Sequence, residues 1–188
     1  MLPLFFSPFW CIFATMKRLT CLLLLLAASC SRSALPPDVA EQQPKSETPV
    51  DEATYTKIFL AGTIDMGNSV DWQAETIRRF RARNDGRYLF FNPRRAAGLD
   101  GTTEDMHYQI RWELEHLEKA DLIVMNILGT SKSPITLLEM GIHIRSGKLH
   151  VACEPTFYRY DNVKVTCEQY GVPLYSSLDE LLADLFAE

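Results

Sequence analysis

The chain of 188 residues carries a formal net charge of −5 and has a pI near 5.4. This acidic balance argues against nucleic acid as a partner, because proteins that bind nucleic acid present a basic surface. The five cysteines form no CxxC pair and no cluster with metal-ligand spacing stands out. We therefore expect neither a metal site nor a bound cofactor.

Residues 1–30 read as a leader. Lys17 and Arg18 give a basic start, residues 19–26 are apolar but too short to span a bilayer well, and small residues lead to Cys30. This ending resembles the lipobox of bacterial lipoproteins, which implies cleavage before Cys30 and lipid on its thiol. It also implies an exported protein held at the periplasmic side or the outer membrane. An ordinary signal peptide, or an uncleaved anchor that starts at Met1, is the alternative.

Residues 31–56 are polar and rich in Pro, Glu, Gln, Ser and Thr, which predicts a flexible tether. Residues 57–188 have the length of one domain. Cys153 and Cys167 lie among apolar neighbours in that domain. We expect buried free thiols there, although export would also allow a disulfide.

Strand and helix patterns alternate along the domain. Apolar runs predict strands at residues 57–62, 88–91, 121–127, 149–153 and 172–175. Helical periodicity predicts helices at residues 71–84, 104–119, 134–146, 162–170 and 178–186. An apolar stripe along the second of these helices comprises Met106, Ile110, Leu114 and Leu117. The alternation predicts an α/β fold, with a parallel sheet covered by helices on both faces.

Glu139 is a carboxylate inside an otherwise apolar helix. At helical spacing it shares one face with Ile135 and Ile142, so we expect that face to pack on the core. Burying an unpaired carboxylate is costly, so the charge must be compensated or used. Ser133 suits the N-cap of this helix and Pro134 its first position. The structural alternative is an edge glutamate that reaches water or pairs with a buried arginine.

Ligands in parallel α/β folds bind at the carboxyl ends of the strands. Residues 62–65, 92–95 and 126–133 follow three of the predicted strands there. The candidate binding residues in these segments are Gly62, Thr63, Asp65, Asn92, Arg94 and Ser133. Taken singly they are weak signals, since simple turns and surface arginines are common at such places.

The order of several longer motifs is more specific. AGTIDMG, VDWQAE, NPRR, QIRWELEHLEKADLIVM, SPITLLEMG and EQYGVPLYSSLDELL follow one another across residues 57–182. This order resembles the nucleoside 2-deoxyribosyltransferase-like family. The resemblance implies a flavodoxin-like three-layer sandwich with a five-stranded parallel sheet. It also implies cleavage or exchange at the N-glycosidic bond of a (deoxy)nucleoside or its 5′-monophosphate.

The same resemblance implies roles for single residues. Glu139 lies in the small-x-Glu-Leu/Met-Gly setting of the family's nucleophile, and Glu113 lies where an acid contacts the nucleobase. Ser133, six residues before Glu139, holds the place that contacts the sugar or phosphate end. Serine there is typical of hydrolases of nucleoside monophosphates. Asp65 would help to hold the sugar, and Arg94 would receive a 5′-phosphate.

This chemistry fits two carboxylates. Glycosidic cleavage passes through an oxocarbenium-like state that a carboxylate stabilises or traps. A second acid, its pKa raised by burial, can protonate the leaving base. The resemblance further implies a homo-oligomer whose sites are completed across subunits.

Two other functions remain open at this point. One is an NAD glycohydrolase, because related flavodoxin-like domains act on a ribosyl bond through one glutamate. The other is a non-catalytic lipoprotein that binds a nucleotide or a partner protein, because a fold alone does not establish activity.

Overall fold

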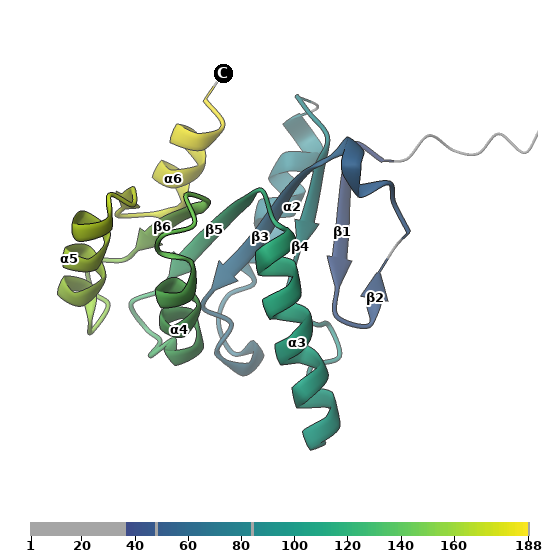
Figure 1. Cartoon of the computed structure of the whole chain (residues 1–188), viewed down its shortest axis with the longest axis horizontal. Coiled ribbons are helices and arrows are strands. Elements are labelled where there is room, and N and C mark those ends of the chain that lie inside the picture. Colours follow the sequence, from purple (N-terminus) through teal and green to yellow (C-terminus); the bar gives the residue numbers. More distant parts are fainter. Residues whose placement is uncertain (1–36, 48, 84, 188) are drawn as a thin grey trace, which may run out of the picture. The chain divides into compact units, whose positions relative to one another are not determined.

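The computed structural model describes residues 37–47, 49–83 and 85–187 (Figure 1). The predicted leader and the predicted lipidation site, Cys30, lie outside the described residues. The elements follow in the order β1 (Val39–Gln43), β2 (Ser46–Glu47), β3 (Thr56–Gly62), α2 (Trp72–Arg83), β4 (Tyr88–Phe91), α3 (Thr103–Lys119), β5 (Leu122–Ile127), α4 (Pro134–His143), β6 (Leu149–Cys153), α5 (Tyr160–Tyr170), β7 (Leu174–Tyr175) and α6 (Leu178–Leu185). Short 3-10 turns lie at η1 (Glu52–Thr54) and η2 (Asp65–Gly67).

The strands form one sheet in the order β2-β1-β4-β3-β5-β6-β7. Only the pairing of β1 with β2 is antiparallel among the described strands. The five predicted strands are β3 to β7, and they take the order 2-1-3-4-5 that is typical of flavodoxin-like folds. The predicted α/β class is therefore confirmed, with seven strands rather than five.

The two additional strands come from the segment that was predicted to be a flexible tether. β1 pairs in parallel with β4, and β2 folds back on β1 through a turn in which Lys45 has a φ of 62°. Val39 and Ala40 are buried in the two apolar layers. The prediction of a tether is thus wrong for residues 39–47. The prediction rested on the polar composition of these residues. Strands near the edge of a sheet are held largely by backbone hydrogen bonds to their neighbours, which do not require apolar side chains.

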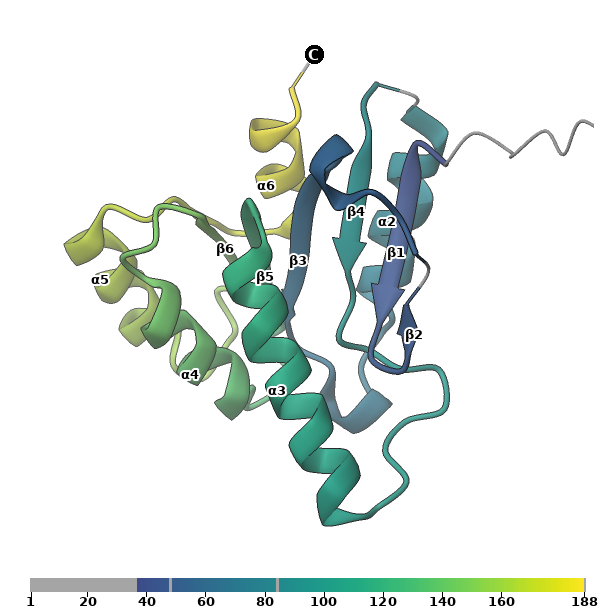
Figure 2. The same cartoon turned by 45° about the vertical axis from the view of Figure 1, so that its right-hand side comes forward.

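The core lies in two layers, one on each face of the sheet. Along β3, Phe59 and Ala61 point into one layer, and Ile58 and Leu60 point into the other. Helices α3, α4 and α5 cover the first layer, and α2 and α6 cover the second (Figures 1 and 2). Alternate side chains of one strand therefore serve both layers, as a sheet covered on both faces requires.

The outer face of α4 differs from the prediction. Ile135 is 58% exposed and Ile142 is 50% exposed, whereas Glu139 is only 8% exposed. Thr136 and Met140 are buried instead. The prediction that Ile135 and Ile142 pack on the core is therefore wrong, and Glu139 lies at the border between the buried and exposed sides.

The apolar stripe of α3 is also largely open to solvent. Met106, Ile110 and Leu114 are between 44% and 49% exposed, and only Leu117 is fully buried. The side chains that α3 buries include Trp112 and His116. Helices α3 and α4 thus each present several apolar side chains to solvent, although single exposed apolar residues are ordinary on a protein surface.

Cys153 and Cys167 are free and buried, as expected. Burial raises the pKa of the Cys153 thiol to about 12 and that of Cys167 to about 11. Thiols of such high pKa are poor nucleophiles, so both act as core residues. None of the helices in the described ranges is long and apolar enough to cross a membrane.

Candidate functional site

The site is built where β3 and β5 end side by side. Gly62 of β3 pairs with Asn126 of β5, and a Cβ at Gly62 would lie 2.2 Å from the Asn126 carbonyl oxygen. Gly62 also has a φ of 134°, which L side chains rarely adopt. Glycine is therefore needed for close strand contact and for the turn that follows it, and its contact with a ligand stays a prediction.

Thr63 joins this turn to the start of α4. Its Oγ1 lies 2.7 Å from Oγ of Ser133 and accepts a hydrogen bond of 3.0 Å from the backbone N–H of Leu128. Its carbonyl oxygen accepts a hydrogen bond of 2.9 Å from Nε1 of Trp72. Thr63 is 1% exposed, so it organises the site from beneath.

Ser133 precedes Pro134 in a left-handed conformation, with a φ of 44°. It occupies the N-cap position, but its side chain makes no capping hydrogen bond. The hydroxyl instead contacts Thr63 and Ser131, the latter at 3.2 Å. A strained non-glycine backbone at the start of a helix is the kind of feature that functional sites retain.

Glu139 and Glu113 form the acidic centre of the site. Burial, together with the smaller effect of the nearby negative charge of Glu113, raises the pKa of Glu139 to about 8. Burial also raises the pKa of Glu113, while a hydrogen bond from Gln109 and the charge of Arg95 oppose the rise. Near pH 7 the unliganded site therefore holds a proton on this pair.

Gln109 fixes the position of Glu113. Its Nε2 donates one hydrogen bond of 2.8 Å to Oε1 of Glu113 and another of 2.8 Å to the carbonyl oxygen of Pro93. The two acceptors determine the orientation of the amide. Gln109 therefore links the acid on α3 to the loop that follows β4, a connection that the sequence did not reveal.

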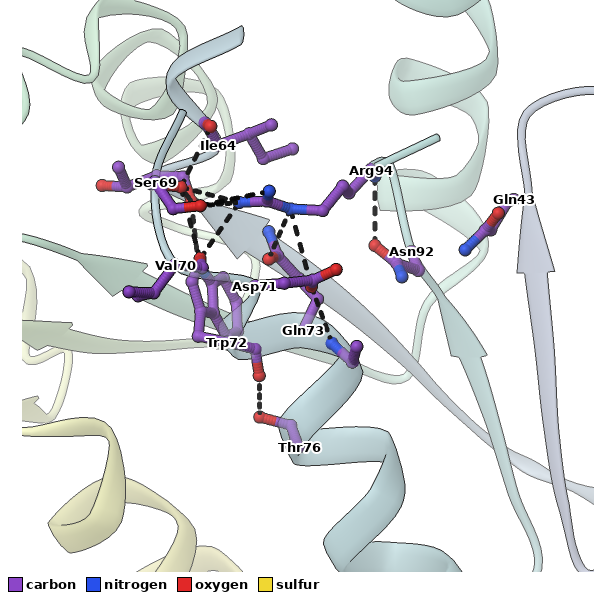
Figure 3. Close-up of polar contacts among 12 residues, drawn as sticks. Gln43, Ile64, Ser69, Val70, Asp71, Trp72, Gln73, Thr76, Asn92 and Arg94 are labelled. Carbon is purple, nitrogen blue, oxygen red and sulfur yellow. Dashed lines mark hydrogen bonds and ion pairs between the residues drawn. The ribbon is translucent and has the colours of Figure 1, made fainter. Parts of the chain in front are cut away.

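Arg94 holds the loop between β3 and α2 (Figure 3). Its guanidinium donates hydrogen bonds of 2.6 Å to Oγ of Ser69, 3.1 Å to the carbonyl oxygen of Val70 and 3.2 Å to Oε1 of Gln73. It also forms an ion pair with Asp71 at 3.6 Å. These contacts give Arg94 a role in shaping the loop, and its direct contact with a phosphate stays a prediction.

Asn92 is likewise turned inward. Its Nδ2 donates a hydrogen bond of 2.9 Å to Oε1 of Glu41, and its Oδ1 accepts one of 3.0 Å from the backbone N–H of Arg94. The side chain is 2% exposed. Both ends of the amide are therefore engaged within the protein, which does not support the predicted contact with substrate.

Asp65 lies on the exposed turn η2 with a φ of 54°, followed by Met66, which is 95% exposed. The structure thus joins Thr63 to Ser133 by a buried hydrogen bond and brings the charge of Glu113 close to Glu139, whereas Asp65 lies on an exposed turn. In the ranges that the structure describes, no group of three His, Cys, Asp or Glu side chains could hold a metal ion.

Comparison with known proteins agrees with this geometry. A family model described as nucleoside 2-deoxyribosyltransferase like matches residues 55–157. The chain therefore belongs to the nucleoside 2-deoxyribosyltransferase-like family, whose match includes every candidate site residue from Gly62 to Glu139. Membership supports a small-molecule nucleoside as substrate and glycosyl transfer at the nucleoside level.

A solved structure shares the fold. The crystal structure of a conserved protein from Enterococcus faecalis V583 superposes with a TM-score of 0.53 at 15% identity, and the match covers 70% of this chain and 97% of that one. At this identity the likeness concerns the fold alone. Comparison with curated proteins gives no match.

Proposed function

We propose that the protein breaks the N-glycosidic bond of a (deoxy)nucleoside or its 5′-monophosphate, with Glu139 as nucleophile. The observation that carries the proposal is the burial of Glu139 beside a second carboxyl group, Glu113, at the carboxyl edge of a parallel sheet. A retaining mechanism requires such a pair of carboxyl groups in different protonation states.

The reaction proceeds in two displacements. A carboxylate oxygen of Glu139 forms a bond to C1′ while the bond from C1′ to the base nitrogen breaks, and its electron pair leaves with the base. The acidic pair holds one proton, which lies on Glu113 in the reactive form and passes to that nitrogen as the base leaves. Water, or a second base, then attacks C1′ and gives a proton to the Glu113 carboxylate. The bond from C1′ to Glu139 breaks in this step, which gives hydrolysis or transfer respectively.

The sugar end lies toward Ser133 in this proposal. The hydroxyls of Ser131 and Ser133 are gathered beside Thr63 at the N-terminus of α4. Backbone N–H groups at a helix N-terminus attract anions, so a 5′-phosphate is favoured there over an uncharged 5′-hydroxyl. Arg94 contributes indirectly, because it holds the loop that faces this end.

The first experiment supplies the full chain with nucleosides, deoxynucleosides, their 5′-monophosphates and NAD, each with and without a second base. Chromatography follows free base and exchanged nucleoside. Base release that disappears in Glu139→Gln, while substrate binding persists, supports the proposal. Release from NAD alone would favour the glycohydrolase. Saturable binding without turnover in the wild-type protein would contradict an enzymatic function.

We further propose that the protein acts as a homodimer through α3 and α4. The exposed apolar side chains Met106, Ile110 and Leu114 on α3, and Ile135, Leu138 and Ile142 on α4, flank the two acids along their helices. On the same outer side of α3, Arg111 and Glu118 lie seven residues apart and have no ion-pair partner among the described residues. A two-fold axis near Leu114 would place Arg111 against Glu118 of the second copy, so the surface is complementary to itself.

The oligomeric state tests this surface. Leu114→Lys should convert a dimer into a monomer in analytical ultracentrifugation, since the charge would face its own copy across the axis. Val165→Lys, on α5, changes a similarly exposed apolar residue and serves as control. A wild-type monomer at micromolar concentration, or a dimer that Leu114→Lys leaves intact, would contradict the proposed face.

Export with lipid on Cys30 remains a proposal based on the sequence. Labelled palmitate should be incorporated into the wild-type chain and not into Cys30→Ala. The variant should also move from the membrane fraction to the soluble fraction. Equal fractionation of both chains would overturn the proposal.

A further inference from the structure

The β1–β2 hairpin lies beside the candidate site but outside the family match. The match begins at residue 55, whereas the hairpin spans residues 39–47. β1 runs in parallel with β4, so the hairpin turn lies at the carboxyl edge of the sheet, where the site is found (Figure 2). This chain therefore places additional structure next to the site that its family defines.

Two side chains of the hairpin contact α3. Oε1 of Glu47 accepts a hydrogen bond of 2.7 Å from Nε1 of Trp112. Lys45 forms an ion pair with Asp105 and lies over the ring of Tyr108, whose hydroxyl accepts a hydrogen bond from the backbone N–H of Lys45. The contacts span two turns of α3, so together they resist rotation of the helix about its axis.

Asp105 connects the same contacts to the loop after β4. It is 3% exposed and accepts two hydrogen bonds from Arg95, at 3.0 and 2.5 Å. Arg95 and Lys45 hold the pKa of Asp105 well below its usual range. The charge of Arg95 also lowers the pKa of Glu113. The ion pairs of the hairpin therefore belong to the electrostatic environment of the acid.

Trp112 transmits the contact to the site. It is 4% exposed, stacks on His116 at 3.9 Å between ring centroids, and directly precedes Glu113 in the helix. Without Glu47 the indole N–H of Trp112 would lose its hydrogen-bond acceptor near the core. An unsatisfied N–H there is unfavourable, so the ring would shift toward another acceptor. Any rotation of α3 at Trp112 moves Glu113, since the two share one rigid turn.

We propose that Glu47 and Lys45 are positioning residues, which hold α3 in the rotation that directs Glu113 at the leaving base. This inference rests on the proposed function. It assigns to the hairpin a role that the family match does not contain. A misplacement of about 1 Å in a catalytic group can lower a rate on the order of 100-fold.

The test compares Glu47→Ala with Glu47→Gln in the full chain. Glutamine keeps an oxygen that can accept from Trp112, so it should stay within about 3-fold of wild-type kcat/KM, whereas alanine should lose about 10-fold or more. Lys45→Met and Lys45→Arg form a second pair of variants. The arginine variant keeps the positive charge and should lose less kcat/KM than the methionine variant. Glu168→Ala, which removes a surface ion-pair partner on α5, should match the wild-type protein.

The leaving group separates positioning from general damage to the structure. A 4-nitrophenyl 2-deoxyriboside needs little protonation of its leaving group. In Glu47→Ala its kcat/KM should therefore fall by less than about 3-fold. Equal losses on the natural and the activated substrate, or equal losses in the alanine and glutamine variants, would overturn the inference.

Hydrogen exchange keeps this test distinct from that of the proposed function. In Glu47→Ala the amides of residues 105–116 should exchange faster than in Glu47→Gln. A wild-type protein that releases no base would defeat the proposed function, and unchanged exchange in Glu47→Ala would independently defeat the coupling of the hairpin to α3.

Discussion

Thr63 and Ser133 lie 70 residues apart in the sequence, yet their hydroxyl oxygens are 2.7 Å apart in the structure. Both side chains are buried, at 1% and 7% exposure. The contact holds the turn after β3 against the start of α4, the helix that carries Glu139. Glu139, the proposed nucleophile, is thus placed by a helix whose N-cap residue is fixed to the turn after a different strand.

Loss of this contact should weaken the fold as well as the site. Thr63→Val keeps the shape of the side chain but leaves the N–H of Leu128 without its acceptor and removes one of the two partners of the Ser133 hydroxyl. We expect the free energy of unfolding to fall by about 1–3 kcal/mol in urea denaturation. Thr54→Val, which removes an exposed hydroxyl contact, should change it by less than about 0.5 kcal/mol. Equal effects would show that the buried contact is unimportant.

Gly62 should not tolerate any side chain. In Gly62→Ala the new Cβ would meet the Asn126 carbonyl oxygen at 2.2 Å in a backbone conformation that alanine disfavours. We expect a loss of more than about 3 kcal/mol, measured as a lower melting temperature. Gly141→Ala is the matched control, because no atom lies within 4 Å of its added Cβ. That change should stabilise α4 by about 0.5–1 kcal/mol.

Glu139 should make stability fall as the pH rises. Its folded pKa, near 8, lies above the unfolded value of 4.5, so the neutral buried form carries no charge penalty below pH 4.5. Between pH 4.5 and 8 Glu139 ionises in the unfolded chain but stays protonated in the folded chain. The free energy of unfolding therefore falls as the pH rises through this range. Glu139→Gln should therefore be near neutral at pH 4 and stabilising by on the order of 3–5 kcal/mol at pH 8. A pH-independent difference in melting temperature would contradict the raised pKa.

The same pKa sets the pH dependence of the proposed reaction. The reactive pair holds one proton, so kcat/KM on substrates whose base needs a proton should fall as the pH rises through about 8, where the pair loses that proton. Glu113→Gln removes the neighbouring negative charge and leaves Glu139 as the one titrating acid of the pair, so kcat/KM should then rise with pH, through a value below 8. It should also reduce the maximal rate on substrates whose base needs a proton. A profile that is flat from pH 6 to 9 would argue against Glu139 as the nucleophile.

The sequence predicted the framework well because its signals were local. The strands β3 to β7 are short apolar runs, and each is followed by a turn or a helix start that can be read from neighbouring residues. The contact pattern inside the site could not be read in this way. Arg94 and Asn92 follow a strand at the ligand edge, as binding residues do, but their partners, Ser69 and Glu41, come from elements far away in sequence.

Two of the differences between the predicted and the observed fold have related causes. Glu41, Gln42 and Gln43 gave no apolar alternation, although Glu41 and Gln42 pair with β4 and Gln43 pairs with β2. On α3, periodicity located the stripe from Met106 to Leu114 but could not tell which side of the helix meets the sheet. Trp112 and His116 meet the sheet instead, packing on each other and, through Phe59 and Phe91, on the strands.

The hairpin also changes the edge that the sheet presents to other chains. β1 covers the outer side of β4, and β2 leaves a strand of two residues at the new edge. So short a strand offers few backbone groups for pairing with another chain, which protects this side of the sheet against edge-to-edge association.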